Sequence, residues 1–162
     1  MKTPILATFV LLTSLCLIAP AKGYDPQDLE RLKTTNSCPR CDLSNAPLNS
    51  ANLSGAFLRG ANLNRANLSQ ANLAGADLSS ANLEAANLSG ANLNSATLIG
   101  VNLKSANLVN AYLTGAGLIS ANLEGANLRG AQMDLVNSRG ARFGQTIMPS
   151  GIVTPPLRYR YR

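Results

Sequence analysis

Residues 51–70 read ANLSG AFLRG ANLNR ANLSQ, four variants of a single five-residue unit. In this frame, leucine occupies every fifth position from Leu43 to Leu128. The frame then continues, with other side chains in the leucine place, through Met133, Ser138, Phe143 and Met148. Self-similarity at a fixed period indicates a fold built from stacked copies of one structural unit.

A period of five fits neither an α-helix nor a flat β-strand. On a helix, each step of five rotates the leucine by about 140°, so the leucines would circle the axis. On a flat strand, an odd period would place successive leucines on opposite faces. One buried row of leucines therefore requires a bend in every unit, which predicts stacked coils, an all-β solenoid.

Each place in the unit has a physical role. Alanine stands two residues before the leucine and points to the same side, so it also lies inside. The residue before the leucine, usually asparagine, points outward, and the two after it are mostly small or polar, as exposed corners require. Alanine is replaced at Cys41, Val101, Val136 and Thr146. The period alone does not distinguish a three-sided coil from a four-sided one.

The A(D/N)LXX pattern of residues 41–150 resembles the pentapeptide-repeat family. The resemblance implies a right-handed quadrilateral β-helix with four pentapeptides in each coil. Residues twenty apart would then be neighbours on one wall. The predicted fold is therefore this β-helix with a short N-terminal capping α-helix.

We divide the chain into a signal peptide (1–21), a capping helix with its lead-in (22–37), the repeats (38–150) and a Pro/Arg/Tyr-rich tail (151–162). Lys2, an apolar run and Ala19-Pro20-Ala21 are typical of a cleaved signal peptide. An uncleaved membrane anchor is the competing interpretation, although the run is short of the ~20 apolar residues that spanning needs. The lead-in to the repeats resembles that of exported cyanobacterial members of the family, which implies the periplasm or the thylakoid lumen.

The segment from Asp25 to Lys33 is predicted to be a helix. Asp25 suits the N-cap and Pro26 suits the first turn. Leu29 and Leu32 would lie on one face of this helix. We expect that face to cover the open edge of the first coil.

Cys38 and Cys41 occupy the leucine and alanine places of the frame, so both should point inward. Three interpretations compete: a structural pair that can form a disulfide after export, a redox-active CxxC motif, and a metal site. The βαβ setting of redox motifs is missing, and the chain has no histidine to complete a metal site. We therefore expect a structural pair, with no metal and no cofactor.

The repeats carry nearly balanced charge, so the net charge of +6 comes mostly from the two ends of the chain. Some family members imitate DNA and bind a topoisomerase, a role that calls for a strongly acidic rod in the cytoplasm. That function is the alternative, and nucleic acid is not an expected partner. The tail residues 157–162 combine Arg and Tyr, which can contact an anionic membrane; a solvated tail is the competing interpretation.

An enzyme is not expected, because histidine is absent and no nucleophile has a base at a recognisable spacing. One wall departs from the repeat by carrying apolar and basic side chains. This candidate docking wall comprises Phe57, Arg59, Ile99, Ile119 and Arg139. Repeat drift without consequence is the competing explanation. The predicted function is an exported structural or protein-protein interaction scaffold, whose partner protein and oligomeric state are unknown.

Overall fold

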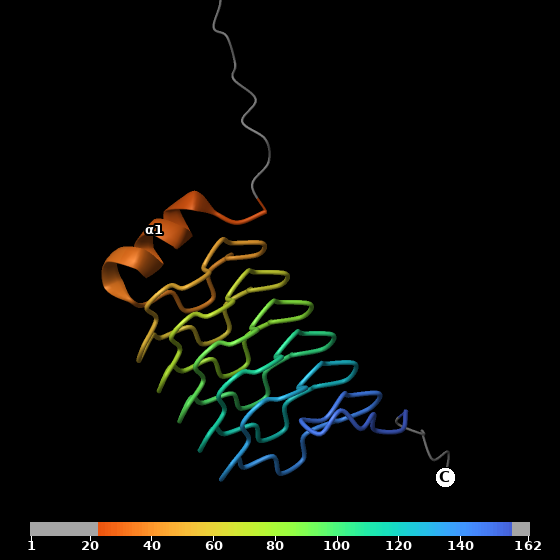
Figure 1. The fold of residues 1–162 in the computed structure, drawn as a ribbon. Coiled ribbons are helices and arrows are strands. Elements are labelled where there is room, and N and C mark those ends of the chain that lie inside the picture. Colours follow the sequence, from red (N-terminus) through yellow and green to blue (C-terminus); the bar gives the residue numbers. More distant parts are fainter. Residues whose placement is uncertain (1–22, 157–162) are drawn as a thin grey trace, which may run out of the picture.

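The computed structural model describes residues 23–156 and shows one helix followed by a stack of coils (Figure 1). Parallel bridges pair residues twenty apart throughout the stack, from Ser37 with Phe57 to Asn127 with Ile147. Four bridged columns run along the stack, one for each pentapeptide of a coil. Each coil therefore has four sides and holds four pentapeptides, which excludes the three-sided alternative.

Backbone hydrogen bonds between successive coils set this register. The leucine amide donates forward to the next coil, as from Leu83 N to Asn102 O at 2.7 Å. The amide before the leucine donates backward, as from Asn102 N to Ala81 O at 3.0 Å. The backbone N–H and C=O groups that point toward the neighbouring coils are thereby hydrogen-bonded, as buried peptide groups require.

A tight turn forms each corner. The amide of Ala46 donates to Leu43 O at 3.0 Å, and Asn45 between them has a φ of 57°. A positive φ at the third turn residue is the mark of a type II turn, which favours Gly or Asn there. Most units meet this demand with Gly, Asn, Ser or Gln, and Arg65 at 55° shows that a larger side chain also takes it.

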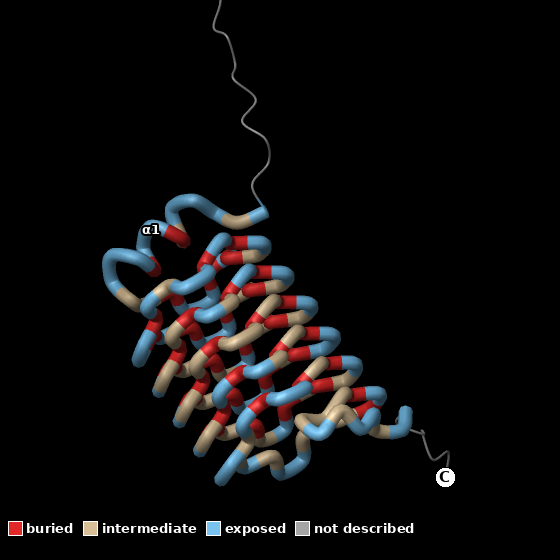
Figure 2. Tube along the Cα trace, viewed as in Figure 1, coloured by how far each residue is buried: buried red, intermediate tan, exposed pale blue. Residues whose placement is uncertain are grey.

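The leucines and alanines form the core of the stack (Figure 2). Every leucine in the repeat frame from Leu43 to Leu128 is at most 3 % exposed, and the alanines between Ala56 and Ala126 are as deeply buried. The row weakens after Ala131, because Met133, Val136 and Phe143 are only half-buried. The inward parity predicted from the pattern is confirmed for the regular repeats, and the last coil is less enclosed.

Helix α1 (Pro26–Thr35) lies across the first coil (Figure 1). Asp25 is its N-cap, with the side chain accepting a hydrogen bond from Gln27 N. Leu29 and Leu32 are buried against the coil, which confirms the predicted helix and its apolar face. The helix ends at Asn36, whose left-handed φ of 54° lets its amide bond to Leu32 O.

The other end of the stack closes differently. Residues 151–154, which were predicted to belong to the tail, fold back as a hairpin, with Val153 bridged antiparallel to Ile147. Thr154 N donates to Thr146 O at 2.9 Å, and the buried Thr146 hydroxyl donates to Leu123 O at 2.6 Å. Residues 151–154 are therefore hydrogen-bonded to the last coil of the stack.

The predicted signal peptide and the end of the tail, residues 157–162, lie outside the described residues. Within residues 23–156, no helix is long and apolar enough to cross a membrane.

Candidate functional site

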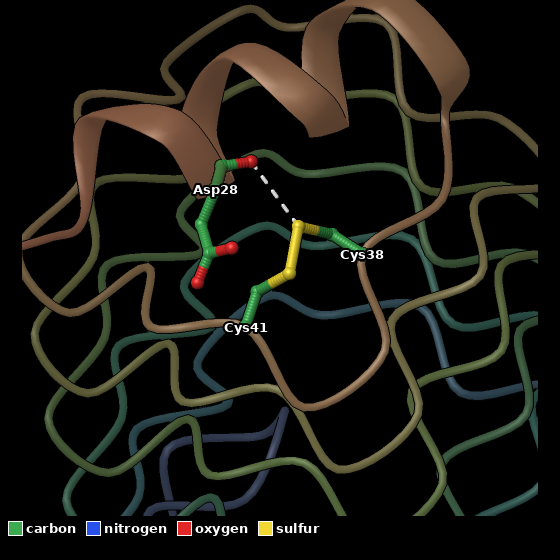
Figure 3. Close-up of side chains that lie close together, drawn as sticks. All are labelled: Asp28, Cys38 and Cys41. Carbon is green, nitrogen blue, oxygen red and sulfur yellow. Dashed lines mark hydrogen bonds between the residues drawn. A yellow bond between two sulfur atoms is a disulfide. The ribbon is translucent and has the colours of Figure 1, made fainter.

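The cysteine-bearing start of the stack lies beneath α1. Cys38 and Cys41 are both buried, and their Sγ atoms are joined in a disulfide (Figure 3). The carbonyl oxygen of Asp28 lies 3.1 Å from Cys38 Sγ, and the Arg31 guanidinium contacts Cys41 Sγ. The disulfide is therefore enclosed by the helix rather than displayed to solvent.

Asp28 connects the helix to the first coil. Its carboxylate accepts hydrogen bonds from Asp42 N at 2.8 Å and from Arg31 Nη2 at 2.9 Å. A charge-assisted bond of this kind is stronger than a neutral one. Neither Asp28 nor Arg31 was predicted to be a site residue, although their spacing of three residues predicts contact on a helix.

A carboxylate oxygen of Asp28 and the two cysteine Sγ atoms lie close enough together to be considered as metal ligands. Cysteine binds metals as the thiolate, however, and sulfur atoms bonded to each other are not thiolates. A single carboxylate does not make a metal site. In the bonded state this cluster therefore serves to fasten the helix.

The structure places the candidate docking wall on one side of the stack. Phe57 belongs to a continuous bridged column that runs from Ser37 to Asn137. Phe57 is 63 % exposed and Ile99 is 44 % exposed, whereas Ile119 is half-buried. Arg59 and Arg139 are exposed at either end. The wall thus presents apolar groups flanked by arginines, on a backbone fixed by inter-coil hydrogen bonds.

Asp77 is the acidic member of this wall. The Ser79 hydroxyl donates to Asp77 Oδ1 at 2.6 Å, and the Ser79 amide donates to the same atom at 2.9 Å. These bonds, with a smaller contribution from the charge of Arg59, lower the pKa of Asp77 from its ordinary value despite partial burial. The carboxylate is therefore held in its charged form by local hydrogen bonds.

Asparagine ladders cover much of the remaining outside. Asn102 Nδ2 donates to Asn82 Oδ1 at 3.1 Å, and Asn82 Nδ2 donates to Asn62 Oδ1 at 3.3 Å. Each Oδ1 also accepts from an amide two residues on, as Asn82 does from Glu84 N at 3.2 Å. These amides are engaged in holding the coils together, so the ladders are structural.

Several exposed apolar side chains were not chosen as site residues from the sequence. Tyr112 replaces asparagine on another wall and is 43 % exposed. Leu135, Ile152 and Val153 are exposed at the C-terminal end of the stack. The sequence already shows that none of them occupies the alanine or leucine place of a repeat. The hairpin that brings residue 153 to the last coil could not be predicted from the sequence.

Comparison with known proteins gives a consistent result. The family model for pentapeptide repeats matches residues 41–79, 76–115 and 102–148, with eight copies. A crystal structure of the pentapeptide repeat protein Rfr23 from the cyanobacterium Cyanothece 51142 is 34 % identical, with a TM-score of 0.73. That match covers 75 % of this chain and 97 % of Rfr23.

A pentapeptide repeat protein from the Arabidopsis thaliana thylakoid lumen is 33 % identical, covers 70 % of this chain and 69 % of its own, and has a TM-score of 0.44. HetL from the cyanobacterium Nostoc is 36 % identical over 73 % of this chain and 62 % of its own, with a TM-score of 0.33. No match was found among the curated proteins. The repeat pattern, the twenty-residue coil, the family model and the match to Rfr23 lead to one conclusion: the chain belongs to the pentapeptide-repeat family.

Proposed function

We propose that this protein is an exported, non-enzymatic scaffold that binds a partner protein through its candidate docking wall. The observation that carries the proposal is the exposure of Phe57 and Ile99 on a wall whose bridged column lacks the asparagine ladders of the other walls. Exposed aromatic and aliphatic groups with neighbouring arginines are the composition favoured at protein interfaces.

The rigidity of the stack supports this role. Residues on one wall are joined coil by coil through parallel bridges, so their spacing is set by the backbone. The stack therefore loses little conformational entropy when a partner that matches this spacing binds, and this favours affinity. The resemblance to the family also supports a right-handed sense for the coil.

The chain's chemistry supports a binding role over catalysis. Histidine is absent from the whole sequence. The carboxylate of Asp77 is engaged by Ser79, and that of Asp28 is engaged by Arg31 and Asp42. We propose further that the Cys38–Cys41 pair is a structural disulfide, formed in the periplasm or the thylakoid lumen to which the signal peptide would direct the chain.

The alternative function is a DNA-like rod that binds a topoisomerase. Acidic and basic side chains are nearly balanced along the repeats, so the rod does not imitate the dense negative charge of a duplex. A cleaved export signal would also separate the protein from a cytoplasmic topoisomerase. Both features favour the exported scaffold.

A crosslinking experiment in the native host tests the proposal. The full chain, tagged after residue 162, is crosslinked in cells, and the captured proteins are identified by mass spectrometry. Double substitution of Phe57 and Ile99 by Asn should abolish capture of a specific protein, because both changes remove exposed apolar surface without touching the core.

Tyr112→Asn is the matched control, since it removes a comparably exposed aromatic group from another wall. Capture should be unchanged in this variant. Equal capture by the native chain and the Phe57/Ile99 variant would refute the docking wall, and recovery of the precursor with its signal peptide in the cytoplasm would refute the export.

A further inference from the structure

A second surface feature lies at the corner next to the docking wall, near the N-terminal end of the stack. A hollow of about 510 Å³ opens there, lined by Pro39, Arg40, Arg59, Gly60 and Ser80. Two of these five residues are arginines, contributed by successive coils. The backbone fixes their relation, because Arg40 N donates to Arg59 O at 3.0 Å.

The repeat geometry explains why the hollow exists. Arg40, Gly60 and Ser80 occupy the same corner place in three successive coils, each with a positive φ. A Cβ at Gly60 would stand 3.4 Å from Arg40 Cγ, at the near limit of ordinary van der Waals contact, and would occupy space that glycine leaves empty. Glycine therefore leaves the floor of the hollow open beneath the arginine side chain, and Ser80 supplies a hydroxyl beyond it.

The positive charges of Arg40 and Arg59 in this hollow are not neutralised by ion pairs among the described residues. Among residues 23–156, Arg31 pairs with Asp28 and Arg142 pairs with Glu124, whereas neither Arg40 nor Arg59 forms an ion pair or a side-chain hydrogen bond. Asp77 acts on Arg59 only through space, because its Oδ1 is engaged by Ser79. Two guanidinium groups thus keep their donors free on one concave surface.

We propose that this hollow binds a phosphate or sulfate group, with Arg40 and Arg59 as the anchoring cations and the Ser80 hydroxyl as an additional donor. Guanidinium groups offer planar, paired donors that match the oxygens of these anions. Two of them on one concave surface favour a doubly charged oxyanion over a single carboxylate.

The group can reach the site as a free ion or on a lipid headgroup, and the chemistry of recognition is the same. The inference does not rest on the proposed docking function. Substitution of Phe57 and Ile99 leaves both arginines in place; Arg59 is shared with the docking wall, whereas Arg40 is not a member of it.

Titration of the ¹⁵N-labelled full chain with inorganic phosphate, at constant ionic strength, tests the site. The side-chain Nε–Hε resonances of Arg40 and Arg59 should shift along a saturable curve. Arg40→Gln and Arg59→Gln should each weaken the apparent affinity by about tenfold or more, because each removes one of two charge-assisted contacts.

Arg65→Gln is the matched control, since Arg65 occupies the same place in its pentapeptide as Arg40, with a φ of 55°, but lies at a different corner and does not line this hollow. It should leave the affinity unchanged. Gly60→Asn is a second test of shape, because Asn tolerates the positive φ and would fill the floor while both charges remain. It should weaken binding as strongly as the loss of an arginine.

Sedimentation with vesicles that carry a phosphatidylglycerol headgroup distinguishes the two sources. Binding to vesicles that depends on Arg40 and Arg59 assigns the site to a lipid phosphate, and saturable binding of phosphate alone assigns it to a free ion. Linear shifts of equal size at all arginines, meaning an adventitious ion only, would overturn the site. Equal weakening by Arg65→Gln would overturn it as well.

Discussion

Truncation of a central leucine tests the physical basis of the stack. Leu88 is fully buried, and its neighbours along the interior, Leu68 and Leu108, are fully buried as well. Leu88→Ala removes buried apolar atoms and leaves a cavity. The coils on either side are held by hydrogen bonds such as Leu88 N to Asn107 O at 2.7 Å, so they cannot close the space.

We therefore expect Leu88→Ala to lower the free energy of unfolding by about 3 to 5 kcal/mol, the upper part of the usual range for such changes. Urea unfolding followed by far-ultraviolet circular dichroism measures the loss. Leu135→Asn is the control, because Leu135 is 88 % exposed and has a φ of 58°, a conformation that Asn tolerates better than Leu. The control should leave stability unchanged or slightly higher. A loss below about 1 kcal/mol for Leu88→Ala, or an equal loss for both variants, would refute the reasoning.

Three further predictions concern the ends and the wall of the stack. Double substitution of Cys38 and Cys41 by Ser should lower stability by about 2 kcal/mol, since the disulfide closes a short loop; an unchanged urea midpoint would contradict this. Asp25→Ala should cost about 1 kcal/mol by removing the N-cap, with Asp25→Asn as a control that keeps the cap, and the helical signal should fall only in the alanine variant. Ser79→Ala should raise the pKa of Asp77 toward its ordinary value of 3.8, which a carbon-13 carboxyl titration by NMR would detect. Because the folded pKa is depressed, the stabilisation is full above that ordinary value and lost as pH falls through the folded pKa, so native and variant should converge in acid.

Much of the architecture could be predicted from the repeat, because each place in the unit has a single physical role. The parity of leucine and alanine placed both inside, and residues such as Leu63 and Ala86 are indeed fully buried. The capping helix was equally accessible, since Asp25, Pro26 and the two leucines form a local pattern. Local chemistry is sufficient where the structure repeats or where a cap acts on its own neighbours.

Contacts of the repeats with helix α1 and with the C-terminal hairpin could not be predicted from local patterns. The bond from Asp42 N to Asp28 and the contact of Arg31 with Cys41 depend on how the helix is docked. The hairpin of residues 146–154 depends on the open edge of the last coil, which no local pattern reveals. The number of sides also came only from the family resemblance, because a period of five is compatible with more than one coil.

The corner hollow illustrates a third case. Arg40 and Arg59 are nineteen positions apart in the chain, and only the twenty-residue register brings them to one surface. Arg59 was predicted to lie on the docking wall, whereas Arg40 was not assigned to any wall. Once the register is known, Gly60 is seen to lie between Arg40 and Ser80 along the stack, where its lack of a side chain leaves the hollow open.

The register of the coil is the claim on which both proposed surfaces depend, and scalar couplings across hydrogen bonds measure it directly by NMR. A four-sided coil predicts a coupling between Leu83 N and the carbonyl carbon of Asn102, and another between Asn102 N and the carbonyl carbon of Ala81. The same offsets should recur through the regular repeats. Couplings that instead link each amide to a carbonyl about five residues nearer in sequence, as a three-sided coil of pentapeptides would require, would contradict the account.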